Sequence, residues 1–345
     1  MTIVADFYQF TVGVDTHAKT HHLAVVDTRT GRVVRDHEFD ASRNGIDRAI
    51  GWVLRNSEPD QVLAGVECVA TYGAGITRGL LGAGVRVVEA KPPKRTSRRN
   101  HGKSDLIDAR AAAHCVLGLD VDDLPTPRDL DGVHAEMGVL LADRDRLNTT
   151  TTRERNALIA LLRAHDLGVD ARHGVSMKQI KQISGWSQST VDGRLFTAQR
   201  LACSILTNKQ AVVVNTRMIR TLVTELVPTV LAKRGVGPIS AAKVLYARSG
   251  SSRITTEARF AALAGVAPIP ASSGNTVRNR LCRGGDRQLN SALHVIARSR
   301  MMSDPETQRY VEKRRAQGKT TAEIRRCLKR YIAREIHKHL TPLGL

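Results

Sequence analysis

The sequence predicts a mixed α/β domain at the N-terminus, followed by two long helices and a basic, mainly α-helical C-terminal part. Three observations support this prediction. Short apolar segments alternate with turns over the first 90 residues, apolar residues then recur every three or four positions between residues 133 and 226, and Lys and Arg dominate the rest. With 345 residues, the chain is long enough for two or three domains with cores of their own.

The N-terminal elements follow one another at short intervals. Apolar segments at 11–15, 22–27 and 32–39 are separated by brief turns and predict a three-strand meander. Residues 42–56 begin with a Ser and repeat apolar side chains at helical spacing. The expected order continues with a strand at 61–67, a helix at 73–83, a strand at 85–89, a basic loop at 91–104 and a helix at 105–117. This order predicts a mixed sheet with helices packed on it.

Residues 119–131 are acidic and contain two prolines, which is typical of a linker. Beyond them, two heptad stripes with polar interruptions predict long helices. The stripes predict an antiparallel coiled coil, within one chain or across a dimer, and an ordinary helical bundle fits them equally well. They consist of Val133, Met137, Leu140, Arg144, Leu147, Thr151, Glu154, Leu158 and Leu161, and of Ala202, Ile205, Lys209, Val212, Thr216, Ile219, Val223 and Leu226. Residues 166–193, between the stripes, are expected to be irregular.

The C-terminal part is expected to be helical and punctuated by glycine and proline. Residues 235–247 form a Gly-rich turn followed by a helix, which fits either a helix-hairpin-helix or a plain helix cap. A helix is expected at 257–264, another from Asp286 onward, and basic helices over the last forty residues. The predicted domains are therefore 8–120, 130–228 and 229–345.

The positive charge is concentrated in the second half of the chain. The formal net charge is +20, yet residues 1–150 hold 19 Lys and Arg against 21 Asp and Glu, whereas residues 151–345 hold 34 against 12. Arginine outnumbers lysine by 40 to 13, and its planar guanidinium suits bidentate phosphate contacts. The second half is therefore predicted to bind nucleic acid.

Other features of the composition exclude several classes of protein. Aromatic residues make up only 3%, which argues against single-strand binding by rows of stacking side chains. The five cysteines are scattered without a CxxC pair, so neither a disulfide framework nor a cysteine zinc site is expected, and a reducing cytoplasm is favoured. We expect neither a signal peptide nor a membrane-spanning segment.

Four acidic residues stand where metal-dependent chemistry would need them. Asp15 ends the first predicted strand and Glu67 the fourth, and the two strands are expected to be neighbours. Asp105 and Asp108 open the following helix three positions apart and share one face. Clustered carboxylates repel unless a hard cation balances them, and such oxygen ligands select Mg²⁺ or Mn²⁺. Taken singly, the acids also fit plainer roles: Asp105 at a helix start, Asp108 as a solvent-facing partner of Arg110.

Three histidines lie close to Asp15 in the sequence. His17, His21 and His22 allow a zinc site, but side chains facing solvent at a strand turn are the favoured interpretation.

Four segments together resemble the insertion-sequence-110-type transposases, also called DEDD transposases or bridge-RNA-guided recombinases. They are VGVDTHAKTHHLAVVD, GVECVATYG, KSDLIDARAAA and AGVAPIPASSGNTVRNRLCRGGDRQL, in that order, and the resemblance extends from about residue 11 to residue 340. It implies a RuvC-like (RNase H-like) α/β domain, a helical coiled-coil segment and a mainly α C-terminal transposase domain. Cys282 departs from the polar residue expected there and is interpreted as packing.

The resemblance also implies roles for particular residues. The family's acidic tetrad falls on Asp15, Glu67, Asp105 and Asp108, which would hold Mg²⁺ or Mn²⁺. The catalytic serine falls on Ser273, with Ser272 as the alternative. Attack by the serine would give a covalent phosphoserine–DNA intermediate, in a site shared between two protomers.

The implied partners are donor and target DNA, a structured noncoding guide RNA and further copies of the chain, as a dimer or tetramer in the bacterial cytoplasm. Base pairing by the RNA would then recognise the DNA sequence, and the protein would bind the backbone phosphates. The candidate nucleic-acid-binding residues are Lys91, Lys94, Arg95, Arg98, Arg99, Lys103, Arg278, Arg280, Arg283 and Arg287.

Two other functions remain open on the sequence, and a third is disfavoured. A metal-dependent endonuclease of the Holliday-junction type would use the acids without serine chemistry. A catalytically inactive nucleic-acid-binding protein would use the basic half alone. An actin-like ATPase shares the meander with an aspartate after strand one, but the expected further Gly-rich phosphate loop is absent from the sequence.

Overall fold

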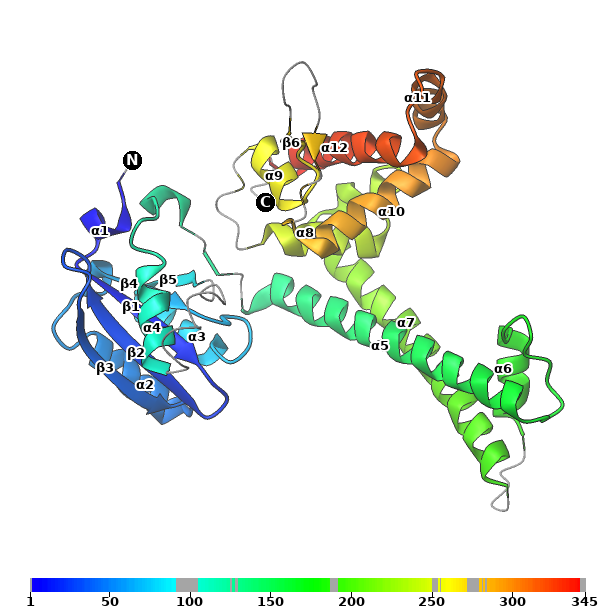
Figure 1. Ribbon diagram of the computed structural model, residues 1–345, viewed down its shortest axis with the longest axis horizontal. Coiled ribbons are helices and arrows are strands. Elements are labelled where there is room, and N and C mark those ends of the chain that lie inside the picture. Colours follow the sequence, from blue (N-terminus) through cyan, green and yellow to red (C-terminus); the bar gives the residue numbers. More distant parts are fainter. Residues whose placement is uncertain are drawn as a thin grey trace. The chain divides into compact units, whose positions relative to one another are not determined.

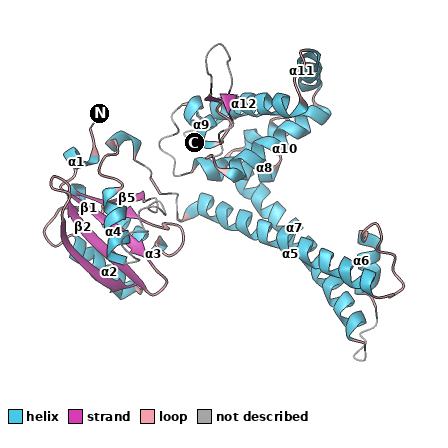
Figure 2. Cartoon of the chain, in the orientation of Figure 1, coloured by secondary structure: helices cyan, strands magenta, loops and turns pink. Residues whose placement is uncertain are grey.

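A computed structural model describes most of the chain (Figure 1). The described residues are 2–90, 105–124, 126–127, 130–186, 192–249, 254, 256–271, 279–280, 282 and 284–341. The chain divides into two compact units, one formed by Met1–Gly132 with Arg248–Phe260 and the other by Val133–Ala247 with Ala261–Leu345. All strands but two short ones lie in the first unit, and the second is almost wholly helical (Figure 2).

The first unit is built on a five-stranded mixed sheet in the order β3-β2-β1-β4-β5. Its strands are β1 (Phe10–Thr16), β2 (Thr20–Asp27), β3 (Val33–Asp40), β4 (Val62–Val66) and β5 (Arg86–Glu89). The first three form an antiparallel meander, whereas β4 and β5 continue the sheet in parallel with β1. The predicted element order, including the neighbouring first and fourth strands, is confirmed.

One face of this sheet is covered by α2 (Arg43–Val53) and α3 (Ala74–Gly82). Alternating residues of the strands, such as Val12, Val14 and Val66, point to this side and pack against Ala49, Val53, Ile76 and Leu80 of the two helices. Ser42 caps α2 by accepting a hydrogen bond from the backbone N–H of Gly45 at 3.2 Å, as the Ser at that position suggested.

The opposite face is covered by α4 (Asp105–His114). Here the strands present glycine and the helix presents alanine. A Cβ on Gly13 would lie 1.8 Å from the backbone oxygen of Ala109, and one on Gly65 would lie 2.8 Å from that of Ala112. The missing side chains therefore let the helix backbone rest directly on β1 and β4.

The prediction of a linker at residues 119–131 is partly wrong. Residues 119–124 pack against the first unit, where Val121 and Leu124 join a buried cluster with Val4, Leu63 and Val88. The short helix α1 (Val4–Phe7) lies beside them, and the backbone N–H of Val4 donates to Leu119 O at 2.9 Å. Burial of these apolar side chains outweighs the acidic composition that suggested a linker.

The second unit contains the two long helices, α5 (Gly132–Ala164) and α7 (Gly193–Leu226). They lie side by side and are joined by hydrogen bonds between polar side chains, three of which (Arg144, Glu154 and Thr216) interrupt the apolar stripes (Figure 1). Arg144 donates to Thr216 Oγ1 at 2.5 Å, and Glu154 accepts from Ser204 and Asn208 at 2.6 and 3.0 Å. These polar groups satisfy one another within one chain, which favours this pairing over registers that would leave them buried alone.

The stretch between the long helices is more regular than expected, because it contains α6 (Met177–Ser184). Ser176 and Gln179 form a reciprocal capping box at its start. Ile180 and Ile183 then pack against Leu158, Leu201 and Ile205 of the long helices, so an apolar face stabilises a helix too short to form by itself.

The remaining elements are mostly helical, as predicted. They are α8 (Pro238–Arg248), α9 (Glu257–Leu263), β6 (Ile269–Pro270), β7 (Asn279–Arg280), α10 (Arg287–Ser303), α11 (Pro305–Ala316) and α12 (Thr321–Leu340). Asp286 caps α10, since its Oδ1 accepts from Leu289 N at 2.9 Å. No helix within the described residues is long and apolar enough to cross a membrane.

Candidate functional site

Asp15 and Glu67 stand next to each other at one edge of the sheet. Val14 of β1 pairs with Val66 of β4 in the parallel ladder, and each acid directly follows its valine. The backbone N–H of Glu67 donates to Val14 O at 3.1 Å, and Thr16 Oγ1 donates to Glu67 O at 3.2 Å. Both acids share their face of the sheet with Gly13 and Gly65, two positions earlier, which is the face that α4 covers.

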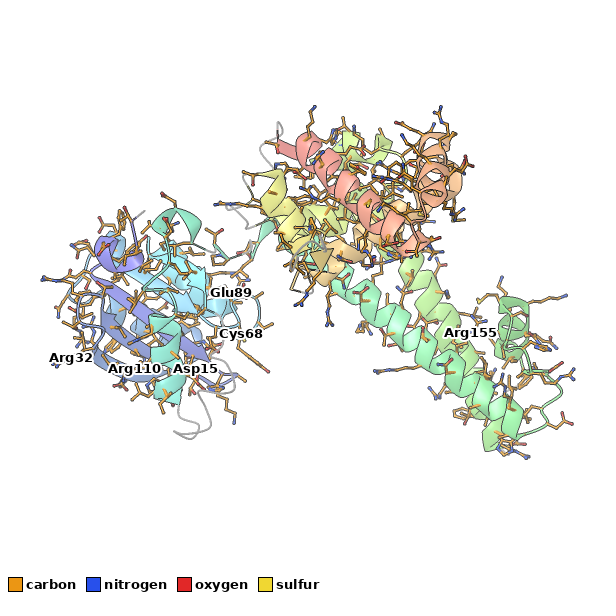
Figure 3. The ribbon with its side chains drawn as sticks, turned by 45° about the horizontal axis from the view of Figure 1, so that its top comes forward. Asp15, Arg32, Cys68, Glu89, Arg110 and Arg155 are labelled. Atoms are coloured by element: carbon orange, nitrogen blue, oxygen red, sulfur yellow. The ribbon has the colours of Figure 1, made fainter. Side chains whose placement is uncertain are left out.

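Asp108 reaches the same edge because of the direction in which α4 runs. Ala109 lies on Gly13 and Ala112 on Gly65, whereas Val116 packs farther back, against Leu63. The first turn of the helix therefore lies toward the edge at which β1 and β4 end. Figure 3 labels Asp15 together with Arg110 of this helix.

The three described carboxylates are withdrawn from solvent. Asp15 and Asp108 are each 6% exposed, and Glu67 is 9% exposed. A solvent-facing role of Asp108 beside Arg110, the plainer alternative, is thus wrong. Burial of ionised carboxylates is costly without compensating charge, so this edge is suited to positively charged ligands or substrates.

The donors fit a hard divalent cation in type, because carboxylate oxygens are what Mg²⁺ and Mn²⁺ prefer. Among the described side chains, no three His, Cys, Asp or Glu residues are close enough together to form a metal site. The predicted tetrad also includes Asp105, which is the first residue of α4 and whose side chain lies outside the described residues.

The three histidines near Asp15 do not act together. His17 Nε2 lies 3.2 Å from Asp15 Oδ2, and His22 Nε2 lies 3.1 Å from Asp36 Oδ2. His21 points to the other face of β2, is only 2% exposed, and has a pKa lowered by burial. The expectation that all three face solvent is wrong for His21, because side chains alternate between faces along a strand.

The predicted nucleophile and most of the predicted phosphate-binding residues are not among the described residues. Ser272 and Ser273 lie outside them. So do Lys91, Lys94, Arg95, Arg98, Arg99, Lys103, Arg278 and Arg283. Arg280 on β7 and Arg287 at the start of α10 are described, and both are exposed to solvent, as contacts with phosphate require.

The ends of the segment that contains Ser273 are joined tightly. A Cβ on Gly285 would lie 2.4 Å from the backbone nitrogen of Gly265, and Asp286 N donates to Leu263 O at 2.7 Å. Gly265 has a φ of +64°, in the left-handed region that glycine adopts without strain. Only glycine therefore suits this close backbone contact.

Sequence reasoning missed two residues that shape the acidic edge. Gly13-Val14-Asp15 and Gly65-Val66-Glu67 repeat one pattern, in which a glycine precedes the acid by two positions on the same face. Glycine inside a strand commonly marks close approach by another backbone, so this repeat was the available signal.

Comparisons with known proteins first define the class. Residues 12–165 match a family model described as a transposase, of the DEDD type found in IS110 elements. Residues 229–312 match a second model, described as the transposase IS116/IS110/IS902 family. The first match contains the acidic edge and the second contains Ser273.

Together the two matches cover more than half of the chain, which therefore belongs to the IS110-type transposases. The chain is also 36% identical over 96 residues to the "Insertion element IS110 uncharacterized 43.6 kDa protein" of Streptomyces coelicolor. That alignment covers 28% of this chain and 24% of the relative, so the chain spans about a quarter of the length of this curated relative.

Proposed function

We propose that the chain is an insertion-sequence transposase that cuts and rejoins DNA through a phosphoserine intermediate, guided by a structured noncoding RNA. One observation above all supports this proposal: three buried carboxylates, Asp15, Glu67 and Asp108, are carried to one sheet edge by two parallel strands and the helix that crosses them. The first unit is proposed to be an RNase H-like, RuvC-like domain, for which the β3-β2-β1-β4-β5 order is suitable.

The acidic residues have a defined part in this reaction. Asp15, Glu67 and Asp108, with Asp105, would hold Mg²⁺ or Mn²⁺, which when bound supplies Lewis-acid stabilisation of charge on a phosphodiester. The protein's own contribution is to keep these carboxylates away from solvent and aligned, and Gly13 and Gly65 serve this by admitting α4 against the strands.

The serine step is a transesterification. Ser273 Oγ forms a bond to the phosphorus of the scissile phosphodiester, the bond from phosphorus to a deoxyribose oxygen breaks, and the serine proton ends on that leaving oxygen. One phosphodiester replaces another, so the bond energy is kept for rejoining. The close contact of Gly265 with Gly285 brings together the two ends of the stretch that carries Ser273.

The proposed partners follow from the charge distribution. The net charge of residues 151–345 suits the phosphates of DNA and RNA, and the 3% aromatic content leaves sequence reading to base pairing. We propose that α5 and α7 act as the coiled-coil segment of a dimer or tetramer in the bacterial cytoplasm. The pairing would bring the acidic edge of one protomer to the serine of another.

The test is recombination of a plasmid that carries the element's two ends, with the chain and its flanking noncoding RNA supplied. Ser273→Ala should abolish both recombination and the covalent protein–DNA adduct seen on denaturing gels, whereas Ser272→Ala is the matched control. Asp15→Asn, which keeps the side-chain volume, should abolish both as well.

Other outcomes separate the competing functions. Strand cleavage that persists in Ser273→Ala would identify a metal-dependent junction endonuclease. Full recombination by Asp15→Asn would contradict every function that uses the acidic edge and would leave a nucleic-acid-binding role. Loss of the adduct in Ser272→Ala alone would move the nucleophile by one residue.

A further inference from the structure

A group of basic side chains gathers where α10 packs against α12. Arg325 and Lys329 lie one turn apart on α12, and His294 and Arg298 lie one turn apart on α10. Burial lowers the pKa of His294, and the charges of Arg325, Lys329 and Arg298 lower it further. Burial and Arg325 also lower the pKa of Lys329. His294 is thus close enough to Arg298, Arg325 and Lys329 for their charges to act on it, and Arg325 acts on Lys329 in the same way.

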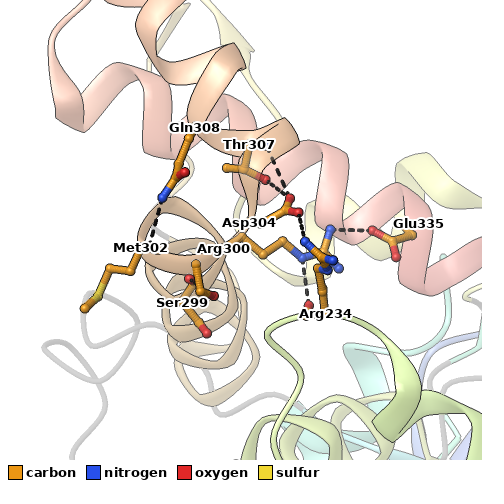
Figure 4. A network of polar contacts seen from close by, with 9 residues as sticks. Arg234, Ser299, Arg300, Met302, Asp304, Thr307, Gln308 and Glu335 are labelled. Carbon is orange, nitrogen blue, oxygen red and sulfur yellow. Dashed lines mark hydrogen bonds and ion pairs between the residues drawn. The ribbon is translucent and has the colours of Figure 1, made fainter.

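No carboxylate offsets this charge within the part of the chain that the structure describes. Two nearby arginines are paired with carboxylates: Arg300 of α10 pairs with Glu335 of α12 at 2.6 Å, and Arg234 pairs with Asp304, just after α10, at 2.7 Å (Figure 4). Arg298, Arg325 and Lys329 make no such ion pair with any described residue. This lack of ion pairs distinguishes the group from the paired arginines nearby.

The group also contains a hydrogen-bond donor that lacks an acceptor. The Nε atom of Arg325 is buried and has no hydrogen-bond partner among the described atoms. A buried guanidinium N–H without an acceptor costs free energy, and an anion in contact with Arg325 would supply both the acceptor and the missing negative charge.

Lys329 connects the group to the base of the segment that contains Ser273. Its Nζ donates to Asn290 Oδ1 at 2.6 Å, and Asn290 Nδ2 donates to Ala264 O at 2.7 Å. Ala264 directly precedes Gly265, which is in contact with Gly285. An anion bound by Lys329 is therefore separated from the contact between Gly265 and Gly285 by one hydrogen-bonded side chain, that of Asn290.

We propose that His294, Arg325 and Lys329 form a binding site for one backbone phosphate of the DNA strand on which the chain acts. Phosphate is the anion that fits a guanidinium, an ammonium and an imidazole together, because its oxygens accept from all three. Asn290 is a positioning residue that links the bound phosphate to the segment base. The choice of DNA rests on the proposed function, since Ser273 follows the same joint.

Binding is the readout, because it needs neither cleavage nor Ser273. Fluorescence anisotropy with a short labelled DNA duplex should show that Arg325→Gln lowers affinity by about tenfold, the value of one charge-assisted contact. The slope of log Kd against log salt should shrink by about one. Arg326→Gln removes the same charge from the exposed neighbour on α12 and should change affinity by no more than about twofold.

Thermal unfolding without nucleic acid supplies a second measurement. Inorganic phosphate, compared with chloride at equal ionic strength, should raise the Tm of the wild type more than that of Arg325→Gln. Without phosphate the variant should be at least as stable as the wild type, because a repelling charge has been removed. A loss of stability would instead indicate that Arg325 is structural.

Several results would overturn the proposal. Equal loss of DNA affinity in Arg325→Gln and Arg326→Gln would show diffuse surface charge and no discrete site. Loss confined to an RNA hairpin probe, with DNA binding intact, would refute the choice of DNA. A response to inorganic phosphate alone would indicate a site for a free anion. All measurements are repeated in a Ser273→Ala background, so failure of the serine mechanism and failure of this site remain distinguishable.

Discussion

Gly13 tests how the acidic edge is assembled. In Gly13→Ala, the new Cβ would lie 1.8 Å from Ala109 O and 2.4 Å from Ala113 N, both backbone atoms of α4. Ordinary contact needs about 3.5 Å, so the helix must retreat by about 1.7 Å. Because neither partner is a flexible side chain, we expect a destabilisation near the upper end of overpacking, about 3 kcal/mol.

The same retreat moves Asp108 relative to Asp15. Misplacement by about 1 Å typically costs about 100-fold in rate, so recombination by Gly13→Ala should fall at least that far under conditions in which the variant stays folded. Urea unfolding followed by circular dichroism gives the free energy of unfolding, and the plasmid assay gives the rate.

Gly51→Ala is the control, because Gly51 lies in α2 with nothing within 4 Å of the added Cβ. It should stabilise the protein by about 0.5 to 1 kcal/mol and leave recombination unchanged. Wild-type stability and activity in Gly13→Ala would refute the close contact of α4 with β1.

Three further predictions concern other parts of the structure. The hydrogen bond from Thr307 and the ion pair with Arg234 lower the pKa of Asp304, so its stabilising effect is complete above the unfolded-state pKa of about 4 and is lost as pH falls through the folded-state value. Asp304→Asn should therefore be less stable than the wild type at neutral pH and should approach it in urea unfolding at about pH 3. Gly285→Ala should cost about 2 kcal/mol, because its Cβ would lie 2.4 Å from a backbone nitrogen, whereas Gly284→Ala, with nothing within 4 Å, should be nearly neutral in the same assay. Glu154→Ala should cost about 1 to 2 kcal/mol in thermal unfolding, because two donors on α7 lose their acceptor; an unchanged Tm would contradict the paired arrangement of α5 and α7.

Much of the first unit could be predicted from the sequence because its signals are local. Apolar alternation and turn residues marked every strand of the sheet, and the strand order placed Asp15 and Glu67 side by side. Two of the wrong predictions, irregular structure at 166–193 and a linker at 119–131, failed for the same reason. The stretch containing α6 and residues 119–124 has weak or misleading local composition, and each is ordered by apolar contacts with residues distant in sequence.

The sequence by itself determined the order of elements, the division into a near-neutral half and a basic half, and the resemblance to the IS110-type transposases, whose family models match residues 12–165 and 229–312. These depend on residue type and short-range spacing. Tertiary structure alone decided that Gly13 admits α4 to the sheet, that Asp108 is buried, and that Lys329 reaches Ala264 through Asn290. Such contacts join residues far apart in the chain, and only the packing of whole helices and strands brings them within hydrogen-bonding distance.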